Sequence, residues 1–265
     1  MKRLSQCPVS IAGMTSKCSP PTVGSSLGRY RLVHTSFHGL CCIGLMCLGA
    51  ATHAARPMVT DDARIVDPQA CQLESWAKRV SGGHEFWALP ACNPGGNLEM
   101  TLGGARLSDA GGGTGVTVLQ AKRLFKPLQT DAWGLGLAVG VQRRKSDAAA
   151  VSVNDLYAYV PVTWSFRNDS WFAHLNLGLA QDHASGRTHK TWGVASEAQV
   201  SERGWLITEV FGQSAPSTRF VQMGLRYWII PNRVQIDTTY GQRLSAGPTD
   251  RSISLGLRLL TPALW

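Results

Sequence analysis

Cysteine is the residue type whose spacing in this chain most directly suggests chemistry. Of the seven cysteines in the 265 residues, only Cys71 and Cys92 follow residue 50, and the others are Cys7, Cys18, Cys41, Cys42 and Cys47. The midpoint of the pair falls at Ser81 and Gly82, where a hairpin would turn. Antiparallel pairing about that turn sets the two cysteines nearly opposite each other, within the short Cα separation that a disulfide needs. We therefore predict a Cys71–Cys92 disulfide formed in an oxidising compartment, with two free thiols as the alternative.

Other residues with chemical potential form weak patterns. Asp182, His183 and His189 could hold a metal ion, but solvent exposure alone accounts for so loose a spacing. The glycine-rich stretch 111–115 lacks the lysine of a phosphate-binding loop, which favours a flexible outer loop. The chain after residue 54 contains no Gly-x-Ser-x-Gly elbow, no His-Glu-x-x-His helix and no closely spaced cysteine ligands. The sequence therefore predicts no catalytic residue, no metal site and no cofactor.

The elements that would position these residues are indicated by a period-two alternation of apolar and polar side chains. The clearest case is 252–259, where Ile and Leu alternate with Ser, Gly and Arg. Alternation of this kind is typical of a half-buried strand. Similar stretches are 133–141, 156–166, 173–179, 192–200, 221–227 and 234–241, with weaker ones at 72–80, 86–92, 98–106, 115–124 and 205–213. The sequence thus predicts about twelve strands.

The connections between these strands differ in length. The short ones, 167–170, 201–204 and 230–233, are rich in turn-forming residues. They alternate with the longer links 144–155, 182–189, 214–219 and 243–251. Bacterial outer-membrane barrels alternate short periplasmic turns with longer outer loops in this way, and both termini are periplasmic. We therefore predict an all-β fold, a transmembrane antiparallel up-and-down β-barrel located in the outer membrane of a Gram-negative cell.

Aromatic residues gather beside the predicted short turns. They are Trp133, Trp164, Trp171, Trp205, Tyr227 and Trp228. Amphipathic rings at one level suit a girdle at the boundary between lipid and water, so we expect these side chains on the outer face. The alternative is that they pack the core of a soluble β-sandwich.

Charged residues on the polar faces of the strands are expected to project into the lumen. They are Glu99, Lys122, Glu197, Glu209, Arg226, Asp237 and Arg258. Mixed charges can satisfy one another in a narrow, plugged barrel, which is the interpretation we favour. They can also line a pore that selects solutes by charge. In a soluble sandwich the same positions would face bulk water, so composition alone does not separate these folds.

Residues 1–54 have the features of an export signal. Basic residues precede an apolar run at 40–50, and small residues follow at 52 and 54, the two positions that a signal peptidase inspects, as in a secretory signal peptide. A buried helix is the alternative. We therefore divide the chain into a signal peptide with an N-terminal extension, 1–54, and an outer-membrane barrel domain, 55–265.

The net charge of +9 belongs largely to that first part. Residues 1–54 contain five basic residues and no acidic ones, so 26 minus 5 leaves 21 basic against 17 acidic residues in the remainder. An excess of 4, without a basic run, gives no surface that would follow a phosphate backbone. We expect no nucleic-acid partner.

The segment Ala-Arg-Pro-Met-Val-Thr-Asp-Asp-Ala at 55–63, followed by Cys-Gln-Leu-Glu at 71–74, resembles the outer-membrane transporter family associated with the meta-pathway of phenol degradation. The cysteine pair departs from that family's pattern. The resemblance covers about twenty residues and defines no functional residue set. It implies an outer-membrane barrel that admits small, often aromatic or apolar molecules.

We therefore expect a transporter or channel for small molecules and no enzymatic activity. The expected partners are outer-membrane lipid, a small solute and the barrel-assembly machinery, which reads a terminal aromatic such as Trp265. Two alternatives stay open: an outer-membrane enzyme of the lipase or protease type, and a structural barrel or soluble periplasmic β protein without transport.

Overall fold

The computed structural model describes residues 58–109, 112–147, 152–182, 186–214, 217–244 and 250–265, and within them the chain forms twelve antiparallel strands. The predicted signal peptide and His183 lie outside these residues. The strands are β1 (Cys71–Val80), β2 (Gly83–Cys92), β3 (Leu98–Asp109), β4 (Gly112–Lys126), β5 (Trp133–Ser146), β6 (Ser152–Phe166), β7 (Trp171–Asp182), β8 (Arg187–Gln199), β9 (Gly204–Ser214), β10 (Ser217–Ile230), β11 (Val234–Arg243) and β12 (Arg251–Leu260).

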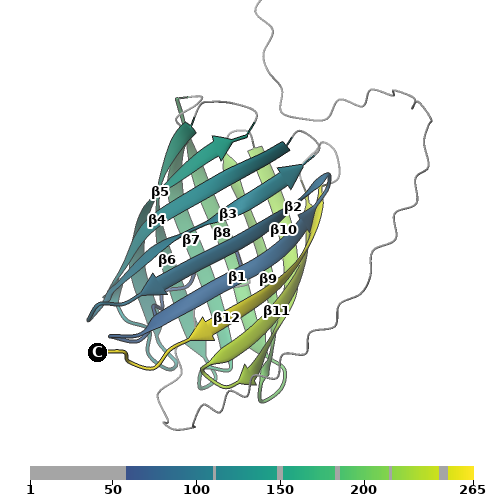
Figure 1. The fold of residues 1–265 in the computed structure, drawn as a ribbon. Helices are drawn as coiled ribbons and strands as arrows, with labels where there is room; N and C mark the ends of the chain where they lie inside the picture. Colours follow the sequence, from purple (N-terminus) through teal and green to yellow (C-terminus); the bar gives the residue numbers. More distant parts are fainter. Residues whose placement is uncertain (1–57, 110–111, 148–151, 183–185, 215–216, 245–249) are drawn as a thin grey trace, which may run out of the picture. The chain divides into compact units, whose positions relative to one another are not determined.

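Each strand pairs with its neighbours in sequence, and β12 pairs with β1 to close the barrel (Figure 1). The predicted fold class is therefore confirmed. We call the end that carries Cys71 and Leu260 the base, and the opposite end the rim. No helix among the described residues is long and apolar enough to cross a membrane, a finding that concerns helices alone.

The predicted contrast between short and long links is weaker than expected. β9 ends at Ser214 and β10 begins at Ser217, inside the expected link 214–219. β7 and β8 likewise extend into the expected link 182–189. Near the rim both faces of a strand meet water, so the apolar alternation stops before the hydrogen-bonded ladder does. The lengths of the links are therefore weaker evidence for which end of the barrel is periplasmic than the sequence suggested.

The first hairpin turns at Ser81 and Gly82, as predicted. Gly82 has a φ of 91°, in the region where glycine is favoured. The resulting register places Cys71 opposite Cys92, with a Cα–Cα separation of 4.0 Å, and the two sulfurs are bonded. The expected disulfide is present and joins β1 to β2 at the base.

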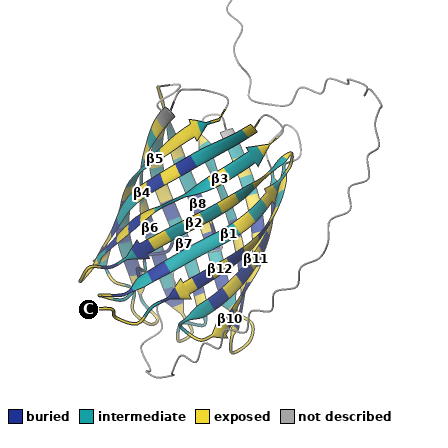
Figure 2. Ribbon diagram, in the orientation of Figure 1, coloured by how far each residue is buried: buried dark blue, intermediate teal, exposed yellow. Residues whose placement is uncertain are grey.

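The outer face of the barrel is a belt of exposed apolar side chains, and burial alternates along the strands (Figure 2). Leu102 and Leu255 are 62% and 65% exposed. Soluble proteins rarely expose so many large apolar residues, whereas a barrel in lipid must. At the base, Trp133 and Trp171 are exposed among them, and Lys126 Nζ lies 3.6 Å from the centre of the Trp133 ring.

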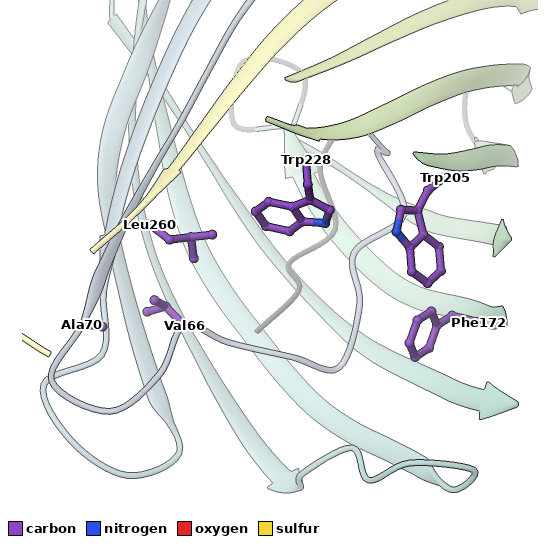
Figure 3. Close-up of a cluster of buried hydrophobic side chains, with 6 residues drawn as sticks. All are labelled: Val66, Ala70, Phe172, Trp205, Trp228 and Leu260. Carbon is purple, nitrogen blue, oxygen red and sulfur yellow. The ribbon is translucent and has the colours of Figure 1, made fainter. Parts of the chain in front are cut away.

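Two tryptophans of the expected girdle are not on the outer face. Trp205 and Trp228 are buried in a cluster at the base, which Figure 3 shows together with Val66, Ala70, Phe172 and Leu260. Their assignment to the girdle was wrong, because strand parity decides the face. Trp205 is four residues from Glu209 on β9 and Trp228 two from Arg226 on β10, so each shares the lumenal face of that charge.

Candidate functional site

The lumen contains a segment of the chain that is not part of the barrel wall. Residues 58–70, which we call the plug, precede β1 and have no strand structure. Asp62 and Ala63 are completely buried, and Val66 and Ala70 are 1% exposed. The predicted barrel domain 55–265 therefore contains two kinds of element, a wall and a segment that fills it.

The backbone of the plug is held by side chains of the wall. Buried N–H groups need acceptors, and a segment without strand partners must find them elsewhere. Here side chains of the strands supply the hydrogen-bond acceptors that the backbone of a neighbouring strand would otherwise provide. The acceptors are Glu209 for Val59 and Thr60 (both 2.9 Å), Thr163 for Ala63 (2.8 Å) and Glu99 for Val66 (2.9 Å).

An ion pair joins the plug to β4. Lys122 Nζ lies 2.8 Å from Asp61 Oδ2 and 3.6 Å from Asp62 Oδ1. The Tyr159 hydroxyl on β6 donates a hydrogen bond of 2.8 Å to the same Asp61 oxygen. Because Lys122 is only 2% exposed, its charge depends on these carboxylates for compensation.

A second charged cluster surrounds Glu197 on β8. Its carboxylate lies 2.7 Å from Arg226 Nη1 on β10 and 3.4 Å from His174 Nε2 on β7. The plug adds a further cation, Arg64, at 3.6 Å. Arg64 also donates to Asp62 at 2.7 Å, so this arginine links the plug's own carboxylate to the wall.

Thr163, His174 and Glu197 lie in the order of a catalytic triad. The Thr163 hydroxyl is 2.9 Å from His174 Nδ1, and His174 in turn faces Glu197. All three side chains are buried, and the hydroxyl already accepts the N–H of Ala63. The trio therefore has no access to a substrate in this arrangement, and it positions the plug.

The other predicted lumenal residues brace the wall. Arg258 donates to Gln72 through Nε (2.9 Å) and Nη2 (2.7 Å) and lies 3.5 Å from Glu74. Asp237 is buried beside Gly256, where an added Cβ would meet its carboxylate at 2.4 Å. All seven predicted residues are thus buried; Glu99, Lys122, Glu197 and Glu209 contact the plug, and Arg226, Asp237 and Arg258 contact other parts of the wall or lie against it.

Sequence reasoning did not assign the plug residues Asp61, Asp62 and Arg64 to the lumen. The inward face of β5 carries small residues, but wall residues fill the space at its glycines: Leu128 at Gly134, Leu124 at Gly136 and Tyr157 at Gly140. On β8, in contrast, a Cβ at Gly193 would lie 2.3 Å from Thr60 Oγ1 of the plug. A small inward residue such as Gly193, together with an acidic, pattern-free segment before the first strand, is the available signal that something other than the wall fills the barrel.

Between the plug and the rim lies a cavity of about 420 Å³. Its floor includes Asp61 of the plug. One wall carries Trp76 and Trp87, stacked with ring centres 5.2 Å apart. Tyr157 and Tyr159, 6.3 Å apart, also line it. The cavity therefore combines aromatic surfaces with charged groups and ends on the plug.

No metal centre is evident in the described part of the chain, where no group of three or more His, Cys, Asp or Glu side chains is placed to hold an ion.

Comparison with known proteins gives a family and a fold. The model of the family described as "Uncharacterised conserved protein UCP029691" matches residues 42–260. None of the curated proteins compared with the chain matches it.

Among solved structures, the KdgM porin in complex with disordered oligogalacturonate is 10% identical, with a TM-score of 0.55 over 71% of this chain and 98% of that one. The NanC porin is 12% identical, with a TM-score of 0.54 over 71% and 98%. The COG4313 outer membrane channel from Pseudomonas putida F1 is 10% identical, with a TM-score of 0.55 over 76% and 98%. Identities this low show a shared outer-membrane barrel fold.

Proposed function

We propose the following function for the chain, which belongs to the family of uncharacterised conserved proteins UCP029691: it is an outer-membrane channel for small molecules, closed by its own N-terminal segment. The proposal combines a fold shared with porins and channels and a lumen filled by the plug. In the described state the plug occupies the path between the cavity and the base.

The observation that carries the proposal is how the plug is attached. From Val59 to Val66 its contacts with the wall described above are side-chain hydrogen bonds and ion pairs, such as those of Glu209 and Lys122. Among the described residues, backbone hydrogen bonds join only its end, Gln69 and Ala70, to Asn93 after β2, and β1 to β12 are paired without the plug. The plug can therefore leave the lumen without breaking a pair of strands. A barrel filled only for rigidity could instead use large inward side chains, whereas Gly193 on β8 leaves room for Thr60 of the plug.

The solute class follows from the cavity. Stacked rings such as Trp76 and Trp87 offer a flat face against which another planar ring can pack. Polar groups at the edge of such a binding site fix the orientation of the bound molecule. The resemblance of residues 55–63 to transporters associated with phenol degradation also favours aromatic solutes. We propose small aromatic molecules as the solutes, with the plug and the cavity acting in series.

An enzymatic function is less consistent with the site. The triad-like group of Thr163, His174 and Glu197 is enclosed by the plug and the wall, and its hydroxyl is engaged with Ala63. A transport role uses every one of these contacts, because they hold a removable closure in place.

Liposome swelling tests the proposal. The mature barrel would be compared with a variant carrying Asp61→Asn and Asp62→Asn, in phenol-sized aromatic solutes and in sugars of similar mass. A variant with Asp250→Asn, an acid at the rim paired with Arg243 at 3.5 Å, is the matched control.

We expect slow swelling for the mature barrel and the control, and fast swelling for the plug variant that is faster in the aromatic solute. A folded plug variant that admits neither solute would contradict a channel function. Equal rates for the two solutes would contradict the aromatic preference alone.

A further inference from the structure

The charged residues on the outward face of the described strands are all basic. Along the described strands, Asp and Glu occupy only positions whose parity faces the lumen: Glu74, Glu85, Glu99, Asp109, Asp155, Asp182, Glu197, Glu209 and Asp237. Lys and Arg occupy both faces. The outward-facing cations therefore have no acidic residue beside them on the same face of any described strand.

Most of these outward-facing cations lie near the rim. They are Arg79, Arg106, Arg143, Lys145, Lys190, Arg219 and Arg251. The outward-facing cations near the base are Arg123 and Lys126, of which Lys126 packs on Trp133. Because both termini of a bacterial barrel are periplasmic, the rim lies at the level of the outer leaflet's headgroups.

One part of this cationic rim has a groove beside it. A depression of about 1020 Å³ runs over β11, β12, β1 and β2. Arg79 and Arg251 border it, and His84 stands opposite Arg79 in the β1–β2 register. Apolar side chains on the outward face also line the groove, namely Ala77, Phe86, Tyr240, Ile253 and Leu255. Lys78 and Glu85, whose parity faces the lumen, border it as well.

The arginines of the groove differ from their neighbour on β3. Arg106 is paired with Asp147. No ion pair joins Arg79 or Arg251 to a carboxylate among the described residues. Both side chains are exposed, and an unpaired cation at the edge of a lipid belt is stabilised by an anion in the adjacent headgroup layer.

We propose that this groove binds a phosphate-bearing lipid of the outer leaflet. Arg79 and Arg251 hold the phosphates, because guanidinium groups donate paired hydrogen bonds that match phosphate oxygens. Phe86, Ile253 and Leu255 contact an acyl chain of the same molecule. The site lies on the outside of the barrel, so it is independent of what passes through the lumen.

Native mass spectrometry of the refolded mature barrel tests the site. Detergent micelles would contain either diphosphorylated lipid A or a phosphate-free glycolipid with similar chains. The test variant carries Arg79→Gln and Arg251→Gln. The control variant carries Arg123→Gln and Lys126→Gln, which removes the same charge from the outer face near the base.

We expect the mature barrel to retain diphosphorylated lipid A and to release the phosphate-free glycolipid. Retention should fall at least about tenfold in the groove variant and stay unchanged in the control. Arg79→Lys with Arg251→Lys should recover part of it. Heat-modifiable migration on gels would verify that each variant is folded.

Several outcomes would overturn the proposal. Equal losses in the groove and control variants would mean that net charge, not this groove, attracts the lipid. Equal retention of the phosphate-free glycolipid would remove the role of the headgroup. Complete displacement by millimolar inorganic phosphate would indicate an anion site that does not need the acyl chain.

Discussion

Asp61 in the plug and Lys122 on β4 form an ion pair, with Oδ2 and Nζ 2.8 Å apart, inside the barrel. Lys122 is 2% exposed, so little water can solvate its ammonium group if the carboxylate moves away. The pair is the clearest link between the removable segment and the wall. Its energetics decide how firmly the barrel is closed.

Breaking this pair from one side should release the plug. Removing one partner of a buried pair costs up to about 3–5 kcal/mol when the other charge is left uncompensated. Asp62 Oδ1, 3.6 Å from Lys122 Nζ, keeps part of that charge compensated, so the cost here is smaller. We expect Asp61→Asn to raise the rate of trypsin cleavage after Arg64, which is shielded while the plug is docked. Cleavage at this bond would be measured by mass spectrometry.

Replacing both partners provides the control. Asp61→Asn combined with Lys122→Met removes the stranded charge, so the double variant should be cleaved more slowly than Asp61→Asn alone. A strictly additive result would mean that the two residues do not depend on each other.

Steric displacement should have the same effect without a change in charge. A Cβ at Gly193 would meet Thr60 Oγ1 at 2.3 Å, so Gly193→Ala should weaken plug docking by about 1–3 kcal/mol. Trypsin cleavage after Arg64 would report it. Gly115→Ala is the control, because its nearest neighbour would be at 3.9 Å. Adding Thr60→Gly should restore protection, and failure to do so would place the clash elsewhere.

Acid should weaken the contribution of Asp62 to closure. Burial raises the pKa of this carboxyl, but Arg64, Lys122 and His174 lower it further, so the net pKa lies below the ordinary 3.8 despite the opposing charge of Glu197. A pKa depressed in the docked state gives stabilisation that is complete above 3.8 and is lost as the pH falls through the docked value.

The measurement is the fraction of open channels in planar bilayers, for the mature barrel and for Asp62→Asn, from pH 8 to pH 3. The difference between them should be constant down to about pH 5 and shrink below about pH 4. Glu197 and His174 are present in both proteins and both influence the pKa of Asp62, so the difference reports the Asp62 carboxyl together with its interactions with these two groups. A difference that grows in acid would contradict the assigned direction.

Reduction of the disulfide should loosen the base. Cys71 and Cys92 are 21 residues apart in sequence, and closing a loop of that size stabilises a fold by about 3 kcal/mol. We expect reductant to lower the unfolding midpoint in urea, and a Cys71→Ser/Cys92→Ser variant to show the lower midpoint with or without reductant. An unchanged midpoint would show that the paired strands alone set the stability of the base.

Alternation and register explain why the wall could be predicted. Each strand repeats its alternating pattern over ten or more residues. Counting residues along the strand therefore tells whether Glu197 or Arg258 faces the lumen or the lipid. The same count, applied to Trp205, would have placed it in the lumen with Glu209. The error came from weighing aromatic type above strand parity.

The plug could not be predicted in this way. Val59 binds Glu209, 150 residues away, while Ala63 and Val66 bind side chains of other strands, so no local period marks the segment. Its backbone is satisfied by side chains whose meeting depends on closure of the whole barrel. One small inward residue, Gly193 on β8, marks space that Thr60 of the plug takes up.

The most direct test of closure by the plug is single-channel conductance of the refolded mature barrel, compared with a variant that lacks residues 58–66. The wall keeps all its strand pairs in that variant, so the barrel should still form. We predict rare, brief openings for the mature barrel and a stable open channel for the variant. Equal conductance in the two proteins, both shown to be folded by heat-modifiable migration, would contradict the account.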